Sequence, residues 1–137
     1  MLDTALHSLA GVPYFALYFI LAAVLLLAFA RIYSWVTPHH EFDLIRANNS
    51  AAAVAFGGAL IGFSIPLSSA ITHSMSLIDC AIWGAVALVV QVLTFFVVKL
   101  ILKQLPERIR QGEMAAGIFS AACSIAVGML NAASMSY

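Results

Sequence analysis

Four residues with metal-binding side chains lie close together in the first third of the sequence: His39, His40, Glu41 and Asp43. Imidazole nitrogens and carboxylate oxygens are ordinary ligands for zinc or iron, so this segment is the first candidate for chemistry. Adjacent histidines seldom converge on one ion without a further ligand. We favour the alternative that both histidines lie on the surface at a helix end, beside lipid headgroups. The sequence therefore predicts no metal site and no cofactor.

A second group of candidates is formed by polar side chains within apolar stretches, where an unpaired polar group is costly. Gln91 is the most central of these, and Asn131 and Ser64 lie nearer to stretch ends. They either form hydrogen bonds between helices or line a path for a solute or ion. The stretches contain no acidic residue or histidine near their centres, which disfavours a proton-coupled carrier.

No motif for covalent or phosphoryl chemistry is present. The sequence lacks a nucleophile elbow, a phosphate-binding loop and a zinc-protease helix, which predicts a protein that is not an enzyme and has no catalytic residues. Cys80 and Cys123 each lie within an apolar stretch and are expected to act as small hydrophobic side chains.

The composition places these residues in a membrane. Hydrophobic residues make up 64% of the chain and charged residues 9%, too little polar surface to cover a soluble globule. Roughly 20 helical residues cross the hydrocarbon layer. The sequence predicts an all-α membrane protein, a single domain over residues 1–137, with four spans at about Pro13–Trp35, Ala51–Ile71, Leu77–Leu102 and Met114–Ser134.

The basic residues predict an orientation. All six lie at or inside two connections, between the first and second spans and between the third and fourth: Arg31, Arg46, Lys99, Lys103, Arg108 and Arg110. Lys and Arg are retained on the cytoplasmic side of bacterial membranes, so both connections should be cytoplasmic and both termini periplasmic. This small charge asymmetry fits a location in the bacterial inner membrane, with the lipid bilayer as partner, and does not resemble a nucleic-acid footprint.

Local signals mark the helix ends. Thr37-Pro38 should end the first span, and the segment 41–46 should form a short surface helix with Phe42 and Ile45 on one face. Asn48, Asn49 and Ser50 supply N-cap side chains for the second span. Pro66 should kink that span and free a carbonyl, with nearby hydroxyls to compensate, namely Ser64, Ser68 and Ser69.

An internal repeat is found when the chain is aligned with itself at an offset of 63 positions. The identities pair Ala52 with Ala115, Ala53 with Ala116, Phe56 with Phe119, Ala59 with Ala122, Leu67 with Leu130 and Ala70 with Ala133. The sequence therefore predicts two helical hairpins, about 12–72 and 76–135, repeated in parallel orientation because each contains two crossings.

Small residues form continuous faces on the second and fourth spans. Gly58 and Gly62 form a GxxxG step, and small residues recur every four positions in the fourth span: Ala116, Ser120, Ser124, Gly128 and Ala132. Such faces allow helix backbones to approach closely. They are expected to pack helices together, or alternatively to line a subunit contact or a narrow path. From these faces we predict a homo-oligomer.

The sequence resembles the YjfL-like family (DUF350/UPF0719) of small bacterial inner-membrane proteins, along nearly its whole length. The resemblance depends on ordered blocks: Thr37-Pro38-His39 with Glu41, Leu44-Ile45 before Asn48-Asn49, Ala55-Phe56, Ile65 to Ala70, Asp79 with Trp83-Gly84, and Gln91. It implies four spans built from a duplicated hairpin, an inner-membrane location and a link to envelope stress systems, but no established reaction. The second connection has Gln111-Gly112 in place of the Asn-Asn pair.

Two functional hypotheses follow. The first is a non-enzymatic, oligomeric scaffold of the membrane or envelope whose cytoplasmic connections bind a protein partner. The second is an oligomeric channel or transporter for a small solute or ion, in which Gln91, Ser64 and Asn131 would face a common polar cavity. In the scaffold, these side chains would contact neighbouring helices.

Overall fold

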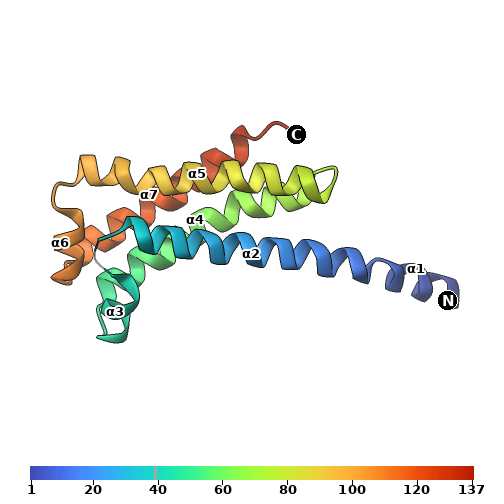
Figure 1. Ribbon diagram of the computed structural model, residues 1–137, viewed down its shortest axis with the longest axis horizontal. Coiled ribbons are helices and arrows are strands. Elements are labelled where there is room, and N and C mark those ends of the chain that lie inside the picture. The colour runs from blue at the N-terminus through green and yellow to red at the C-terminus, as the bar shows by residue number, and fades with distance from the viewer. Residues whose placement is uncertain (39) are drawn as a thin grey trace.

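Over the residues that the computed structural model describes, 1–38 and 40–137, the protein consists of helices and their connections and contains no strand (Figure 1). Four helices are long and apolar enough to cross a membrane, and their ends lie within two residues of the predicted spans, apart from a helical extension before the first. The predicted all-α fold with four spans is confirmed. These helices are α2 (Val12–Val36), α4 (Ser50–His73), α5 (Leu77–Ile101) and α7 (Met114–Ser134).

Three short helices complete the described chain: α1 (Leu2–Ala10), α3 (Glu41–Arg46) and α6 (Leu105–Arg110). The sequence predicted α3 but neither α1 nor α6. Helices α3 and α6 lie at the same end of the bundle, which we call the basic end, and α1 extends beyond the opposite end (Figure 1).

The centre of the bundle is the contact between α4 and α7, the most extensive between any two helices described. Both helices run away from the basic end (Figure 1). A Cβ added at Gly62 would lie 2.7 Å from the Ser124 carbonyl carbon, and one added at Gly128 would lie 2.8 Å from the Gly62 carbonyl carbon. No side chain fits at either place, so the two backbones touch directly.

Helix α2 is attached by aromatic side chains close to the basic end. Its only buried residues are Phe29 and Tyr33. The Phe29 ring stacks on Phe63 at 4.8 Å between ring centroids, and Tyr33 contacts Phe56 and Phe95, each at 5.8 Å. The preceding half of α2 diverges from the bundle and continues toward α1 (Figure 1).

The Asn49 side chain joins the two connections at the basic end. The Asn49 side-chain oxygen accepts a hydrogen bond from the Ala52 N–H at 3.0 Å, which caps α4 as predicted. Its amide group also donates to the carbonyl oxygens of Ile109 and Arg110 at 2.9 and 3.2 Å. Asn49 therefore satisfies backbone groups at the start of α4 and at the end of α6 together.

The two connections share a backbone pattern. Helices α3 and α6 each have six residues and each follows a residue in the left-handed conformation, His40 or Gln104. A second left-handed residue follows each helix, Asn48 in one connection and Gly112 in the other. His40 and Gln104 are 64 positions apart in the sequence, as are Asn48 and Gly112. The side-chain identities of the predicted repeat are 63 positions apart. Descent from a duplicated hairpin stays a prediction.

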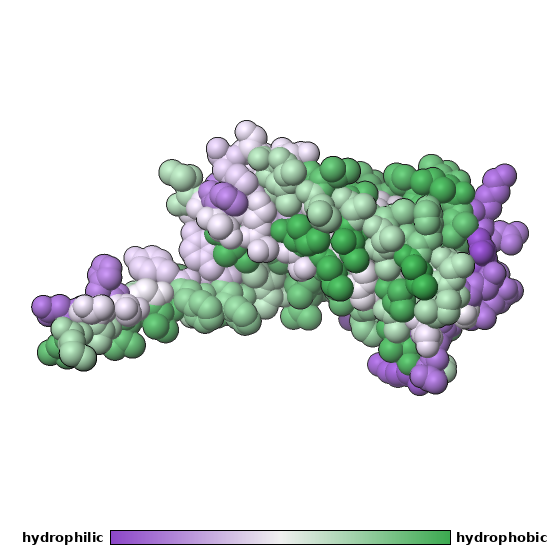
Figure 2. Space-filling model, turned by 180° about the vertical axis from the view of Figure 1, so that it is seen from behind, coloured by the Kyte–Doolittle hydropathy of each residue, from purple (hydrophilic) through white to green (hydrophobic). Residues whose placement is uncertain are grey.

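The surface shows where the bilayer must lie. Figure 2 shows a broad hydrophobic band over the bundle and a concentration of hydrophilic residues at the basic end. Large apolar side chains point outward along the spans, among them Leu27, Leu93 and Leu130, exposed by 70, 54 and 68%. Water cannot cover such a surface favourably, whereas lipid chains can.

Candidate functional site

The most central polar residues meet inside the helical bundle. The Gln91 amide of α5 donates to the Ser124 carbonyl oxygen of α7 at 3.1 Å. The Asn131 amide donates at 3.4 Å to the Ala87 carbonyl oxygen and at the same distance to the Gln91 side-chain oxygen. Gln91 and Asn131 are nearly inaccessible, at 2 and 9% exposed. These hydrogen bonds connect α5 with α7.

Ser64 is not part of this cluster. It lies on an exposed face of α4, where its hydroxyl donates to the Ile61 carbonyl oxygen of the same helix at 2.7 Å. The structure therefore brings together two of the three residues of the candidate polar path, and it does not place all three around one cavity.

The candidate packing residues lie on the facing sides of α4 and α7. All are buried: Gly58, Gly62, Ser120, Ser124 and Gly128. A Cβ added at Gly58 would overlap Ala121 of α7. These faces are used within one protomer, which removes them as a basis for the predicted subunit contact.

Pro66 lies within α4, which continues to His73. Because proline has no N–H, it leaves the Gly62 carbonyl oxygen without its helical donor. That oxygen lies against Gly128 of α7, where it would overlap an added Cβ. The expected compensation by serine is not seen in the described chain, because Ser64 bonds to Ile61 and Ser69 pairs with Tyr137 at 2.8 Å.

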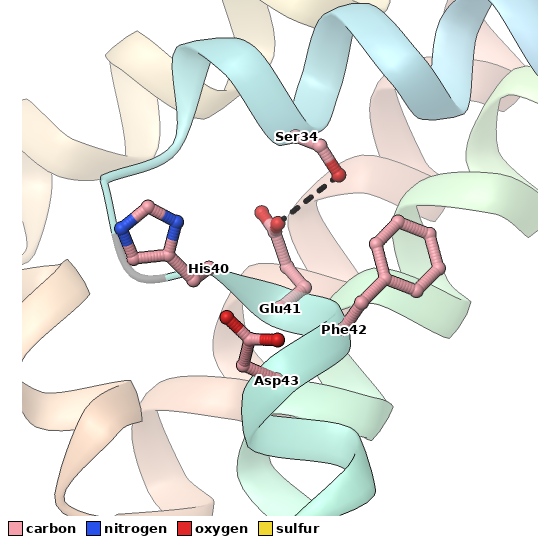
Figure 3. A pocket seen from close by; sticks show the side chains of 5 residues that line it. All are labelled: Ser34, His40, Glu41, Phe42 and Asp43. Carbon is pink, nitrogen blue, oxygen red and sulfur yellow. Dashed lines mark hydrogen bonds between the residues drawn. The ribbon is translucent and has the colours of Figure 1, made fainter.

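A second polar cluster surrounds Glu41 at the basic end (Figure 3). The Glu41 side chain is 1% exposed. Its carboxyl group receives a hydrogen bond from the Ser34 hydroxyl at 3.3 Å and contacts the Thr37 hydroxyl, which also donates to the Tyr33 carbonyl oxygen at 2.9 Å. Glu41 thus fastens the start of α3 to the end of α2.

Burial raises the pKa of the Glu41 carboxyl above its ordinary value, because the ionised form loses hydration. The Ser34 hydroxyl, which donates to this carboxyl group, opposes the rise in pKa because its hydrogen bond stabilises the ionised form.

A small pocket of about 140 Å³ opens beside Glu41, lined also by Ser34, His40, Phe42 and Asp43. Figure 3 shows the His40 and Phe42 rings on opposite sides of the Glu41 side chain. Within residues 1–38 and 40–137, no three His, Cys, Asp or Glu side chains come close enough to hold one metal ion. His39, the remaining member of the predicted cluster, lies outside the described residues.

Sequence reasoning missed the role of Glu41. It considered Glu41 only as a candidate metal ligand and expected the two histidines to lie on the surface beside lipid headgroups. One available signal was the spacing of Ser34, Thr37 and Glu41, which puts two hydroxyls on the last turns of α2 just before the carboxyl group. The bridge from Asn49 to α6 had no comparable signal, because α6 itself was not predicted.

A family model described as Domain of Unknown Function (DUF350) matches residues 7–135. The chain belongs to this family. It is 42% identical over 132 residues to the UPF0719 inner membrane protein YjfL of Escherichia coli strain K12, covering 96% of this chain and all of the relative, with the same values for YjfL of strain O157:H7. The resemblance seen in the sequence is thereby confirmed.

A more distant relative is the UPF0719 transmembrane protein YshE of Bacillus subtilis, 24% identical over 120 residues, or 86% of this chain and 90% of YshE. No solved structure matches this chain. The names of the relatives and the four apolar helices agree on an integral membrane protein, and the family description assigns no activity.

Proposed function

We propose that this DUF350 protein is a non-enzymatic, oligomeric scaffold component of the bacterial inner membrane, with a protein partner at its basic end. The observation that supports this most strongly is how the central polar groups are used. Gln91 and Asn131 bind backbone carbonyl oxygens and each other, which holds α5 against α7. Side chains that stabilise helix contacts in this way are not arranged to solvate a passing ion.

In this proposal, the basic end faces the cytoplasm and both termini face the periplasm. The support is the position of the basic residues, all of which lie in or near the connections that α3 and α6 form at one end. Single cysteines at Arg46 and Arg108, in a variant without Cys80 and Cys123, should both react with a membrane-impermeant thiol reagent only after the cells are opened. Reaction of either one in intact cells would contradict this orientation.

For the oligomer, we propose that a second copy packs along the diverging half of α2. The support is that two grooves flank this half. One of about 300 Å³ lies between α2 and α4, and one of about 410 Å³ lies between α2 and α5. In the span that includes α2, only 6% of the residues in the most apolar stretch are buried, compared with 50% of those in the corresponding stretch of α4.

Disulfide crosslinking tests this contact in native membranes. In a variant whose own cysteines are replaced by alanine, Phe19→Cys should form a covalent dimer on oxidation. Val89→Cys on α5, which is exposed to a similar extent, is the matched control and should not. Equal crosslinking at both positions, or a purely monomeric mass in mild detergent, would refute the oligomer.

A flux assay separates the scaffold from a channel. The purified protein in liposomes should leave gradients of Na⁺, K⁺ and Cl⁻ intact. Leakage that Gln91→Leu abolishes and Gln104→Leu does not would overturn the scaffold in favour of a channel, since Gln104 is exposed at the basic end and Gln91 is buried.

A further inference from the structure

A groove at the basic end has the lining of a lipid site. It has a volume of about 370 Å³, and it lies between Leu27, Ala30 and Arg31 of α2 and Phe42 of α3. Three of these four side chains are apolar, and the fourth carries a permanent positive charge. Neither polar cluster described above uses these residues, apart from Phe42 at the edge of the Glu41 pocket.

The groove lies at the depth where lipid headgroups meet hydrocarbon. Arg31 precedes the last residue of α2, Val36, by five positions, which places it about 7.5 Å from the helix end. Trp35, one turn further on, is 72% exposed and is a typical interfacial side chain. Leu27, one turn deeper, is 70% exposed on the side of the hydrocarbon. The lining therefore changes from charged to apolar within about one helical turn, from Arg31 to Leu27.

Arg31 differs from the arginines of the two connections in its charge partners. Arg46, Arg108 and Arg110 each form an ion pair with a nearby carboxylate. In the described part of the chain, the guanidinium of Arg31 has no carboxylate partner and lies over the Trp35 ring, 5.7 Å from its centroid. Its planar donors are free to bind a phosphate oxygen pair from the membrane.

The wall opposite α2 is fixed in place. The Phe42 ring makes an edge-to-face contact with Phe56 of α4, with ring centroids 5.1 Å apart. Glu41, the neighbouring residue, is held by Ser34 and Thr37 of the α2 end. The groove is thus preformed, and a ligand need not order α3 in order to bind.

We propose that this groove binds one anionic phospholipid, with the headgroup phosphate on Arg31 and an acyl chain along Leu27, Ala30 and Phe42. The charge of the site selects the headgroup, and the apolar lining selects a lipid over a soluble phosphate. The site does not depend on the scaffold function or on the number of subunits.

Quenching of Trp35 fluorescence tests the proposal in liposomes of phosphatidylcholine. Trp83→Phe removes the only other tryptophan. Phosphatidylglycerol with brominated acyl chains should reach half-maximal quenching at a roughly fivefold lower mole fraction than brominated phosphatidylcholine, the preference expected for one basic side chain at an anionic surface. Glycerol phosphate in solution should not displace the brominated lipid.

Arg31→Gln should abolish this preference. Lys99→Gln, which removes the same charge from an exposed position of α5, should leave it unchanged. Loss of the preference in both variants would show a diffuse surface charge and overturn the site, as would equal quenching by the two lipids in the parent protein.

Phe42→Ala provides a test that leaves the charge unchanged. In native mass spectrometry, the parent protein should retain one phosphatidylglycerol molecule, and Phe42→Ala should lose it severalfold more readily. Val89→Ala, which shortens an exposed apolar side chain elsewhere, should behave as the parent does. Equal retention in the two alanine variants would exclude the groove as the binding place.

Discussion

Helices α4 and α2 are attached to the bundle in opposite ways. Helix α4 presents glycine and alanine to α7, so that the two backbones touch, and half of its most apolar stretch is buried. Helix α2 belongs to a more apolar span, yet its two buried side chains are the aromatic residues Phe29 and Tyr33 near the basic end. In water the more apolar helix would be the buried one.

The difference follows from the solvent. Lipid chains are as apolar as leucine, so burying a leucine between helices gains little, whereas small residues allow many backbone contacts. We therefore expect substitutions at the α4–α7 contact to destabilise the fold strongly and equivalent substitutions along α2 to be tolerated. Four measurements of the free energy of unfolding, by titration with SDS in mixed micelles, test this contrast.

The largest effect is expected for Gly128→Ala, which should lower the free energy of unfolding by about 3 kcal/mol, because the added methyl group would overlap the Gly62 backbone. The matched control is Gly57→Ala, where a Cβ meets nothing within 4 Å. This control should be neutral or slightly stabilising, since alanine favours a helix over glycine. If Gly128→Ala and Gly57→Ala lowered the free energy of unfolding equally, a glycine at the α4–α7 contact would matter no more than one on the lipid face.

The second largest effect is expected for Asn49→Ala, at about 1.5 kcal/mol, because it removes the cap of α4 and two hydrogen bonds to α6. Asn49→Asp keeps the acceptor for the cap but loses the donors, so its loss should be intermediate. Asn48→Gly, which keeps the neighbouring left-handed backbone, should be nearly neutral. If Asn49→Asp matched the parent, the bridge between the two connections would contribute nothing.

The spans and the Asn49 cap show which features the sequence can predict. The spans and the α4 cap were predictable because each depends on residues adjacent in the chain, as in Asn49 followed by an apolar run. The repeat offset of 63 taken from side-chain identities differs by one residue from the spacing of 64 between the left-handed residues of the two connections, and the repeat itself stays a prediction. Left-handed residues at the connections identify the backbone offset, and Gln104 and Gly112 share no residue type with their counterparts.

The candidate site was predicted in part for a similar reason. Gln91 and Asn131 were found because a polar residue in a membrane span must have a partner, whichever helix supplies it. Ser64 was grouped with them, but it lies two positions beyond Gly62, about 200° around α4, and therefore faces away from α7. The spacing of Ser34, Thr37 and Glu41 indicates which hydroxyls can reach the Glu41 carboxyl, but the burial of Glu41 also depends on how α3 packs against α4, a long-range contact that this spacing does not specify.

The third effect, expected on the α2 side, is that Gly84→Ala lowers the free energy of unfolding by less than about 1 kcal/mol. The new Cβ would lie 2.6 Å from the tip of Leu25 on α2, and this flexible end can rotate away. Gly58→Ala makes the same change at α4, where Ala121 backbone blocks the methyl group, and it should cost at least twice as much. A larger loss at Gly84 than at Gly58 would reverse the contrast between the helices.

The smallest effect is expected at the other attachment of α2, where Glu41→Gln should change the pH dependence of stability more than its magnitude. The folded-state pKa of Glu41 is raised above 4.5, so the proton is bound more tightly in the folded protein than in the unfolded one. The resulting stability is complete below pH 4.5 and is lost as the pH rises through the folded-state pKa. Glutamine cannot ionise and still offers an oxygen to Ser34, so this loss should be absent in the variant.

The measurement is the difference in unfolding free energy between the parent and Glu41→Gln from pH 4 to pH 8. Relative to the variant, the parent should lose stability as the pH rises and then reach a plateau. Asp43→Asn, a neighbouring carboxyl group that is 75% exposed, is the control and should not remove this slope. A parent that gained stability relative to Glu41→Gln with rising pH would mean that α2 is held by an ionised carboxylate, and its attachment would then be an electrostatic one rather than contacts between neutral side chains.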